Sequence, residues 1–467
     1  MGLPSSGGGS LSLVDQESKV QTRPTGWSLE SAFALLALAL PPALFYGLLS
    51  RTTLNLPILD DYNAVLDFLN RWIDCRNWTE KLLWFLSSQL VDVKPFFVRA
   101  VALVQYLLLG HVDFRLLTVC SVGLISLLAL LLWKMFIPAC SNRTLRLVLF
   151  LPVSFLLFEL QYMTELNVVT TGMQHIAGVL FSFLAIYLLN QNTLRSFTGS
   201  CAALVLAIAS DGNGFMVIAV GLLILFRTRR FRHAIVFAGI SILCVVAYAF
   251  HYHRVVATGA IAHPPLYTRL FYVLGFIGSA AGLNYHFLAG GLVLGTLLVA
   301  FFVWKVVKGD ARRKPLLYDC ALFMLLTAVV ASSGRSGFGL GQSLAGRYTL
   351  YSLVCVCLFW MVMVEDSLVH HPSPLGSGLF LGMLICSAVY SLCWDLTGYS
   401  IIHQRNQGLI AAIVSFEHPS GADPNPIPVP KYRFPGPNGV EEGLKLCQDL
   451  RTIMNRSIEL GIYRPQF

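Results

Sequence analysis

The chain has 467 residues, a formal net charge of +9, and 56% hydrophobic residues against 12% charged. Soluble domains usually carry about 25% charged residues, so this composition leaves too little polar surface for a water-soluble particle. Long apolar runs recur from Ser31 to Trp394 and do not alternate in polarity as barrel strands do. A soluble enzyme, a fibrous protein and a disordered chain are excluded, and an all-α polytopic membrane protein is predicted.

Residues 1–30 are rich in Gly and Ser and are predicted to form a disordered tail. A membrane domain over 31–394 then contains about eleven spans, in chain order 31–49, 116–133, 147–163, 174–190, 197–210, 213–226, 234–250, 287–304, 316–333, 348–364 and 376–393. The last segment, 395–467, holds a Pro-rich stretch and an amphipathic helix over 439–461. We expect this helix to pack on the outer face of the membrane domain.

Two further apolar stretches, 96–110 and 269–286, are interpreted as interfacial or re-entrant helices, because one is short and carries an arginine and the other contains several glycines. With both excluded as spans, Lys and Arg gather in the loops on one side, which the positive-inside rule assigns to the cytoplasm. If both spanned, the basic cluster Arg227–Arg232 would lie outside. The sequence thus predicts a cytoplasmic N-terminus, an outer C-terminus and a large outer loop over 50–115.

The adjacent acids Asp60 and Asp61 open this outer loop. Two neighbouring carboxylates soon after a span require water, a cation or hydrogen-bond donors. A carboxylate held near a substrate hydroxyl can act as its general base. The alternative is that one of the two caps the helix predicted to begin near Tyr62, and the two roles are compatible.

Arg335 and Arg347 flank a glycine-rich outer loop. A guanidinium can bind a phosphate bidentately, and glycines let the backbone approach it closely. The alternative is a headgroup anchor in which Arg347 and Tyr348 lie at the membrane interface. The glycine spacing is not that of a P-loop, because no Gly-Lys-Ser/Thr follows.

Glu159, Glu165 and Asp211 lie in or just beyond apolar helices, and carboxylates at membrane depth are functional candidates because their burial is costly. Glu165 and Asp211 fit solvated loop positions equally well. His175 is interpreted as interfacial. The loop histidines fit no metal motif, and the basic residues form no stripe with interleaved aromatics, which argues against a nucleic-acid partner.

This layout resembles the GT-C superfamily of membrane glycosyltransferases, which includes protein O-mannosyltransferases and bacterial transferases that modify lipopolysaccharide or cell-wall glycans. The shared features are a first span with its N-terminus inside, an aspartate pair opening the first large outer loop, interfacial helices in that loop, and many spans with short loops. The segment from Ser333-Gly-Arg-Ser-Gly-Phe-Gly to Gly346-Arg-Tyr-Thr-Leu-Tyr also resembles that of poorly characterised bacterial polytopic proteins.

The resemblance implies transfer of a sugar from a polyprenyl-phosphate carrier to a glycan, lipid or protein acceptor on the outer side of the membrane. It makes Asp60 or Asp61 the base. Arg347, together with Arg335, would stabilise the charge on the departing phosphate, and Tyr348 would position the carrier. No cofactor is required and a divalent metal is left open. A bacterial inner membrane is favoured over the endoplasmic reticulum.

Glu165 would correspond to the acidic residue that family members often present in a second outer loop, and Asp211, at the outer tip of a predicted hairpin, is a further candidate for substrate binding. Two alternatives remain open. A transporter or flippase for lipid-linked glycans or other amphiphiles would line a path through the bilayer midplane with polar groups. A polysaccharide polymerase or ligase would depend on arginines in its outer loops.

Overall fold

The computed structural model describes residues 29–136, 142–162, 168–253, 263–283, 285–313, 315–370, 374–417 and 439–465, and the regular elements in these ranges are helices. Among them, eight are long and apolar enough to cross a membrane. They are α1 (Leu29–Thr52), α5 (Phe114–Phe136), α8 (Val169–Leu189), α11 (Phe231–Ala249), α13 (Leu288–Val307), α15 (Pro315–Arg335), α16 (Gly346–His370) and α17 (Pro374–Glu417). The protein is therefore an all-helical, multi-pass membrane protein.

Three of the eleven predicted spans correspond to shorter helices. They are α6 (Arg143–Leu157), α9 (Leu194–Ser210) and α10 (Met216–Arg227), with 15, 17 and 12 residues. A span needs about 20 residues, so none of the three meets that length alone. The two stretches interpreted as interfacial form α4 (Phe96–Leu109) and α12 (Leu266–Ile277), which are equally short.

The last long helix departs most from the sequence prediction. The apolar run predicted to end at residue 393 continues as α17 to Glu417, because Ile402, Leu409 and Ile413 keep a buried stripe beyond the polar residues that follow the run. Its apolar part spans 34 residues. At 1.5 Å per residue this is about 50 Å, against about 30 Å of bilayer hydrocarbon, so α17 extends beyond the apolar layer.

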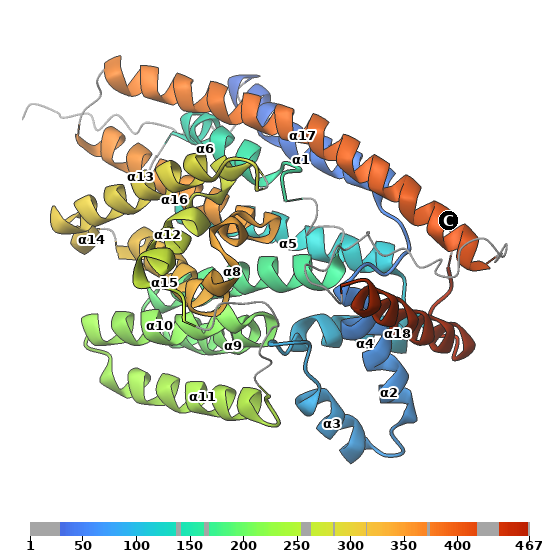
Figure 1. Ribbon diagram of the computed structural model, residues 1–467. Coiled ribbons are helices and arrows are strands. Elements are labelled where there is room, and N and C mark those ends of the chain that lie inside the picture. The colour runs from blue at the N-terminus through green and yellow to red at the C-terminus, as the bar shows by residue number, and fades with distance from the viewer. Residues whose placement is uncertain are drawn as a thin grey trace, which may run out of the picture.

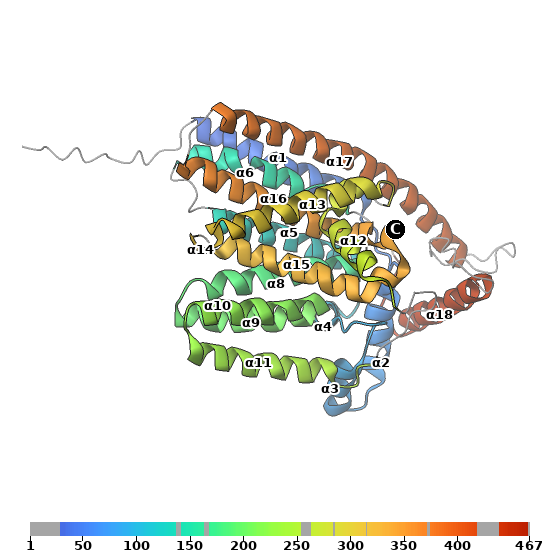
Figure 2. The ribbon, with the colours of Figure 1, turned by 60° about the vertical axis from the view of Figure 1, so that its left-hand side comes forward.

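The long helices lie side by side in one bundle, and short helices gather at one of its ends (Figures 1 and 2). These are α2 (Phe68–Asp74) and α3 (Trp78–Ser87), and the 21-residue α18 (Gly439–Glu459) lies at the same end, whereas the short α14 (Asp310–Arg313) lies at the opposite end. We call residues 53–113 and 439–465 together the cap. The cap thus combines the predicted first outer loop with the C-terminal segment.

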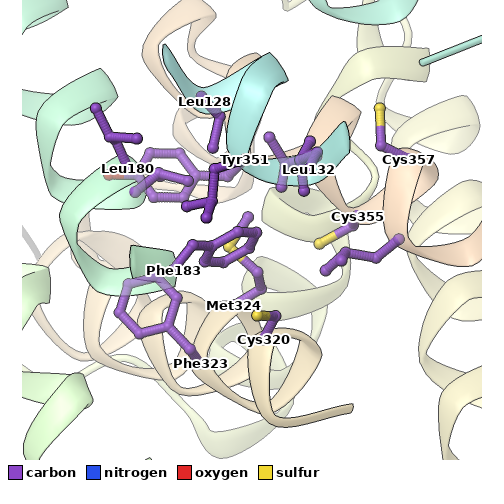
Figure 3. Packing of buried hydrophobic residues seen from close by; sticks show 14 of the residues in the cluster. Leu128, Leu132, Leu180, Phe183, Cys320, Phe323, Met324, Tyr351, Cys355 and Cys357 are labelled. Carbon is purple, nitrogen blue, oxygen red and sulfur yellow. The ribbon is translucent and has the colours of Figure 1, made fainter. Parts of the chain in front are cut away.

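The bundle core is built from apolar side chains of α5, α8, α15 and α16. Figure 3 shows Phe183 of α8 and Phe323 of α15 meeting below Leu128 and Leu132 of α5. The rings of Phe183 and Phe323 form an edge-to-face pair with centroids 6.1 Å apart. Tyr351 of α16 is buried in the same cluster, so α16 brings a polar hydroxyl into this largely apolar interior.

The cap has a separate hydrophobic core. Tyr62 and Phe68 of the first loop pack there with Leu450 and Met454 of α18. The last residues of α17 also join this cluster through Leu409. The C-terminal helix therefore packs on the cap helices that follow α1.

Polar contacts hold α18 against these cap helices. The buried Asn70 side chain donates to the carbonyl of Ile453 (3.2 Å) and accepts from the hydroxyl of Ser457 (3.0 Å). The hydroxyl of Tyr463 donates to the carbonyl of Asn55 (2.6 Å). The Ser457 hydroxyl also donates to the carbonyl of Ile453 (2.9 Å), so Asn70, Ile453 and Ser457 form one local network.

We expect Asn70→Ala to loosen α18 by about 1–2 kcal/mol, because it removes two hydrogen bonds between the cap helices and α18. Amide hydrogen exchange within α18 measures this opening. The matched control is Arg456→Ala, which removes an exposed ion pair with Asp74 and should have little effect. Equal acceleration in both variants would show that Asn70 has no special part in docking α18.

Candidate functional site

Asp61 is fully buried and accepts four hydrogen bonds. Its carboxylate receives the amides of Val169 (3.2 Å) and Thr170 (2.8 Å), the hydroxyl of Thr170 (2.7 Å) and the amide of Ile58 (3.2 Å). Val169 and Thr170 begin α8, so Asp61 supplies the N-terminal cap of a helix more than a hundred residues away. Its side chain makes no capping bond to its own helix, and the expected local cap is thus wrong for Asp61.

Burial raises the pKa of Asp61 to about 7, although the hydrogen bonds from Thr170 and Ile58 act to lower it. Three of these bonds join the first loop to the start of α8, and the fourth, from Ile58, is made within the loop. This leaves Asp61 inside the protein, covered from solvent. Its role in the structure is to hold this connection, and Asp60 is the member of the pair that faces solvent.

Asp60 belongs to a charged cluster, since Arg347, Arg335, Asp92 and His175, from four other parts of the chain, all act electrostatically on its carboxyl group. Desolvation raises its pKa, while the positive charges of Arg347 and Arg335 act to lower it; Asp92 raises it and His175 lowers it. Leu59, immediately before it, has a positive φ of 51°, which marks a sharp turn of the backbone at this point. The structure therefore brings Asp60 and Arg347 within electrostatic reach of each other.

Arg335 is engaged in a two-pronged ion pair. Its Nη2 donates to both carboxylate oxygens of Asp92, at 3.0 and 2.8 Å. The same loop is held by the Tyr252 hydroxyl, which donates to the carbonyl of Asp92, and by the Lys94 amide, which donates to the hydroxyl of Tyr248. Arg335 thus fastens the segment before α4 to the end of α15, and its charge is largely balanced there.

Arg347 is half-buried at the start of α16. Its guanidinium carbon lies 5.1 Å from the ring centroid of Tyr348, and Nη2 lies 3.5 Å from the side-chain oxygen of Gln342. Tyr348 itself is buried and packs against Phe276, with ring centroids 4.6 Å apart. The structure therefore places Tyr348 in the bundle core, where its ring supports Arg347.

A network around Asp211 forms the second part of the site. Asp211 accepts from Nδ1 of His175 (2.9 Å), the hydroxyl of Tyr351 (3.0 Å) and the side-chain amide of Asn213 (2.9 Å). The proton between His175 and Asp211 is assigned to Nδ1, because a carboxylate only accepts. A Cβ at Gly178 would lie 3.0 Å from the Cβ of Asp211, so glycine permits this close approach.

Burial acts to raise the pKa of Asp211, but the charge and hydrogen bond of His175, followed by the bonds from Tyr351 and Asn213, outweigh it and the pKa is lowered. Asp211 therefore stays a carboxylate at neutral pH. Nε2 of His175 has no hydrogen-bond partner among the described residues, and its side chain is 14% exposed. Asp211 thus orients the ring through Nδ1 and leaves Nε2 without a hydrogen bond in the described part of the chain.

Sequence reasoning placed His175 at the interface and overlooked Asp92, Tyr351 and Asn213 as partners. The available signals were a Gln-His pair at the start of an apolar run and the Asp-Gly-Asn-Gly turn between two such runs. These signals locate each residue at a helix end but do not pair them.

Of the remaining acidic candidates, Glu165 lies outside the described residues. Glu159 is fully buried and accepts from the backbone amide of Gln161. In the described part of the chain, no group of three or more His, Cys, Asp and Glu side chains is arranged to hold a metal ion.

No family model, curated protein or solved structure matches this chain. The architecture defines a multi-pass helical membrane protein. Its charged cluster lies where the cap meets the bundle, and this cluster is the candidate functional site.

We expect Arg335→Gln and Asp92→Asn each to accelerate amide exchange over residues 88–95, because either change releases the ion pair that fastens this segment. The pair is partly exposed, so the effect should be about 1 kcal/mol or less. In the double variant the second change should add little. Additive effects would show that the two side chains act independently.

We expect Asp211→Asn to lower stability at pH 7 by about 2–4 kcal/mol, because it removes the charge that His175 faces and disrupts a buried network. The folded pKa of Asp211 lies below its unfolded value of about 3.9. Its contribution is therefore present above pH 4 and is lost as the pH falls further. Thermal unfolding in detergent measures this, with Tyr351→Phe as a control that removes one donor. A difference that grows below pH 4 would contradict the assignment.

Proposed function

We propose that the protein is a GT-C-type glycosyltransferase that moves a sugar from a polyprenyl-phosphate carrier to an acceptor hydroxyl at the cap end of the bundle. The observation that carries the proposal is a solvent-accessible carboxylate, Asp60, within electrostatic reach of Arg347. Sugar transfer from a phosphate needs a base for the attacking hydroxyl and a cation for the departing phosphate. The cluster offers both groups.

The two aspartates have different parts in this proposal. Asp60 takes the proton of the acceptor hydroxyl as its oxygen attacks the anomeric carbon, and its raised pKa favours acceptance of that proton. The bond from the anomeric carbon to the phosphate oxygen breaks, and its electron pair leaves with the phosphate. Asp61 is a positioning residue, because its hydrogen bonds fix the loop that carries Asp60.

Arg347 is the main stabiliser of the departing phosphate in this scheme. Arg335, which sequence reasoning paired with it, is balanced by Asp92. Arg335 instead orders the loop beside Asp60. His175 adds a positive electrostatic contribution at Asp60. The proposed setting is the outer side of the membrane, with the N-terminus cytoplasmic, and a bacterial inner membrane is favoured.

A transporter for an amphiphile is the second candidate, and one observation favours it. Glu159 and Asp395 are buried within the bundle, and each has a carboxylate oxygen without a hydrogen-bond partner among the described residues. Unpaired acids at membrane depth occur along ion and proton pathways. Uptake of a lipid-linked sugar into sealed vesicles, without release of the sugar, would favour this alternative.

Incubation of the purified protein with polyprenyl-phosphate sugars and a range of acceptors tests the proposed transfer. Asp60→Asn should lower the rate of carrier release by about 10²–10⁴-fold, because the base is lost. Arg347→Gln should lower it by about 10²-fold or more. Arg335→Gln is the matched arginine control and should cost about tenfold or less, because its guanidinium acts through the loop.

Two outcomes would contradict the proposal. If Asp60→Asn turns over at the wild-type rate, Asp60 is not the base. If both aspartates are dispensable while Arg347 and Arg335 are essential, a polysaccharide polymerase or ligase fits better. Asp61→Asn reports on folding and is read with a stability measurement.

A further inference from the structure

Arg405, on α17, holds a guanidinium that the protein covers but does not pair. Nε and Nη2 are inaccessible to solvent and have no hydrogen-bond partner in the described part of the chain. A guanidinium keeps its charge in proteins and carries five N–H donors. Covered donors without acceptors, on a group that stays charged, are costly. The arrangement is therefore incomplete without an anion.

The described residues supply no such anion. Asp395 is the nearest acid before Arg405 on α17, and ten residues of helix separate them by about 15 Å. None of the ion pairs of the described residues includes Arg405. The third guanidinium nitrogen, Nη1, is not covered in this way, and the side chain as a whole is half-buried. An anion can therefore reach the guanidinium from the surface.

The position of Arg405 indicates which anion this is. Ile402, one turn before it, belongs to the bundle core, and Leu409, one turn after it, belongs to the cap core. The side chain of Asn406 donates to the carbonyl of Thr52, the last residue of α1. Arg405 thus lies where α1 ends and the bundle meets the cap, which is the level of the lipid headgroups.

At this level the abundant anion is the phosphate of a lipid, and the planar guanidinium matches its geometry. We propose that Arg405 binds the phosphate group of a membrane lipid at the junction of bundle and cap, beside the end of α1. Two lipids present this chemistry, a bulk phospholipid and a polyprenyl phosphate. The inference does not depend on sugar transfer, because it rests on Arg405 and the helix ends around it.

The proposal predicts that the stability of Arg405→Gln relative to the wild type depends on whether lipid is present. In a delipidated sample the unpaired charge remains, so Arg405→Gln should be at least as stable as the wild type. With an anionic lipid, only a chain that retains the guanidinium gains binding energy. The matched control is Arg51→Gln, because Arg51 is an exposed arginine next to the end of α1.

The experiment follows thermal unfolding of the delipidated full-length protein in an uncharged detergent. Phosphatidylglycerol, phosphatidylcholine or polyprenyl phosphate is added to separate samples. Phosphatidylglycerol should raise the midpoint of the wild type and of Arg51→Gln by about 2 °C or more, and that of Arg405→Gln by less than half as much. Protection by polyprenyl phosphate alone would assign the site to the carrier.

Native mass spectrometry of the same samples counts the lipids retained and supports the result if Arg405→Gln loses one. Arg405→Lys retains the charge without the fork and should retain part of the shift, which separates lost binding from misfolding. A full lipid-induced shift in Arg405→Gln would overturn the proposal. The proposal would also be overturned if no lipid raised the unfolding midpoint of the wild type, because Arg405 would then be a buried charge without a lipid partner.

Discussion

The candidate site depends on the hydrogen bonds between the carboxylate of Asp61 and the N-terminus of α8. It accepts the first amides of α8 and at the same time the amide of Ile58 in its own loop. A helix N-terminus carries unsatisfied N–H groups and a partial positive charge, and a buried carboxylate satisfies both. Because α8 is part of the bundle core, this contact fixes the beginning of the cap against the bundle. The position of Asp61 in turn sets the position of Asp60, the preceding residue.

The other acids around the site are balanced one by one. Asp92 faces Arg335, and Asp211 faces His175. Each pair joins segments far apart in the chain, so their charges serve to hold the loops and helix ends in register. Asp60 keeps access to solvent within the same cluster. A site built in this way combines rigid surroundings with one acidic group that can exchange a proton, which is the combination that general-base chemistry needs.

The cap has a hydrophobic core of its own, separate from that of the bundle, and is therefore a packed unit. Residues that follow α1 and residues of α18 bury one another, and the end of α17 reaches into the same cluster. The length of α17 makes this possible, because the helix continues past the apolar layer. Arg405 lies at the junction between the two cores, and its Nε and Nη2 atoms have no hydrogen-bond partner among the described residues. In the proposal above, a lipid phosphate supplies that partner.

The sequence by itself determined the fold class and most helices, because apolar runs of about twenty residues have no other stable state in a membrane. It also offered the pairs Asp60/Asp61 and Arg335/Arg347 as site residues, without deciding between the members of either pair. It misjudged the end of α17, because the polar residues after 393 hide a buried stripe that continues to Ile413. Only the tertiary structure decided that Asp61 caps α8, that Asp92 forms an ion pair with Arg335 and that Asp211 orients His175. These partners are 109, 243 and 36 positions apart, and helix packing, which no local pattern encodes, brings them together.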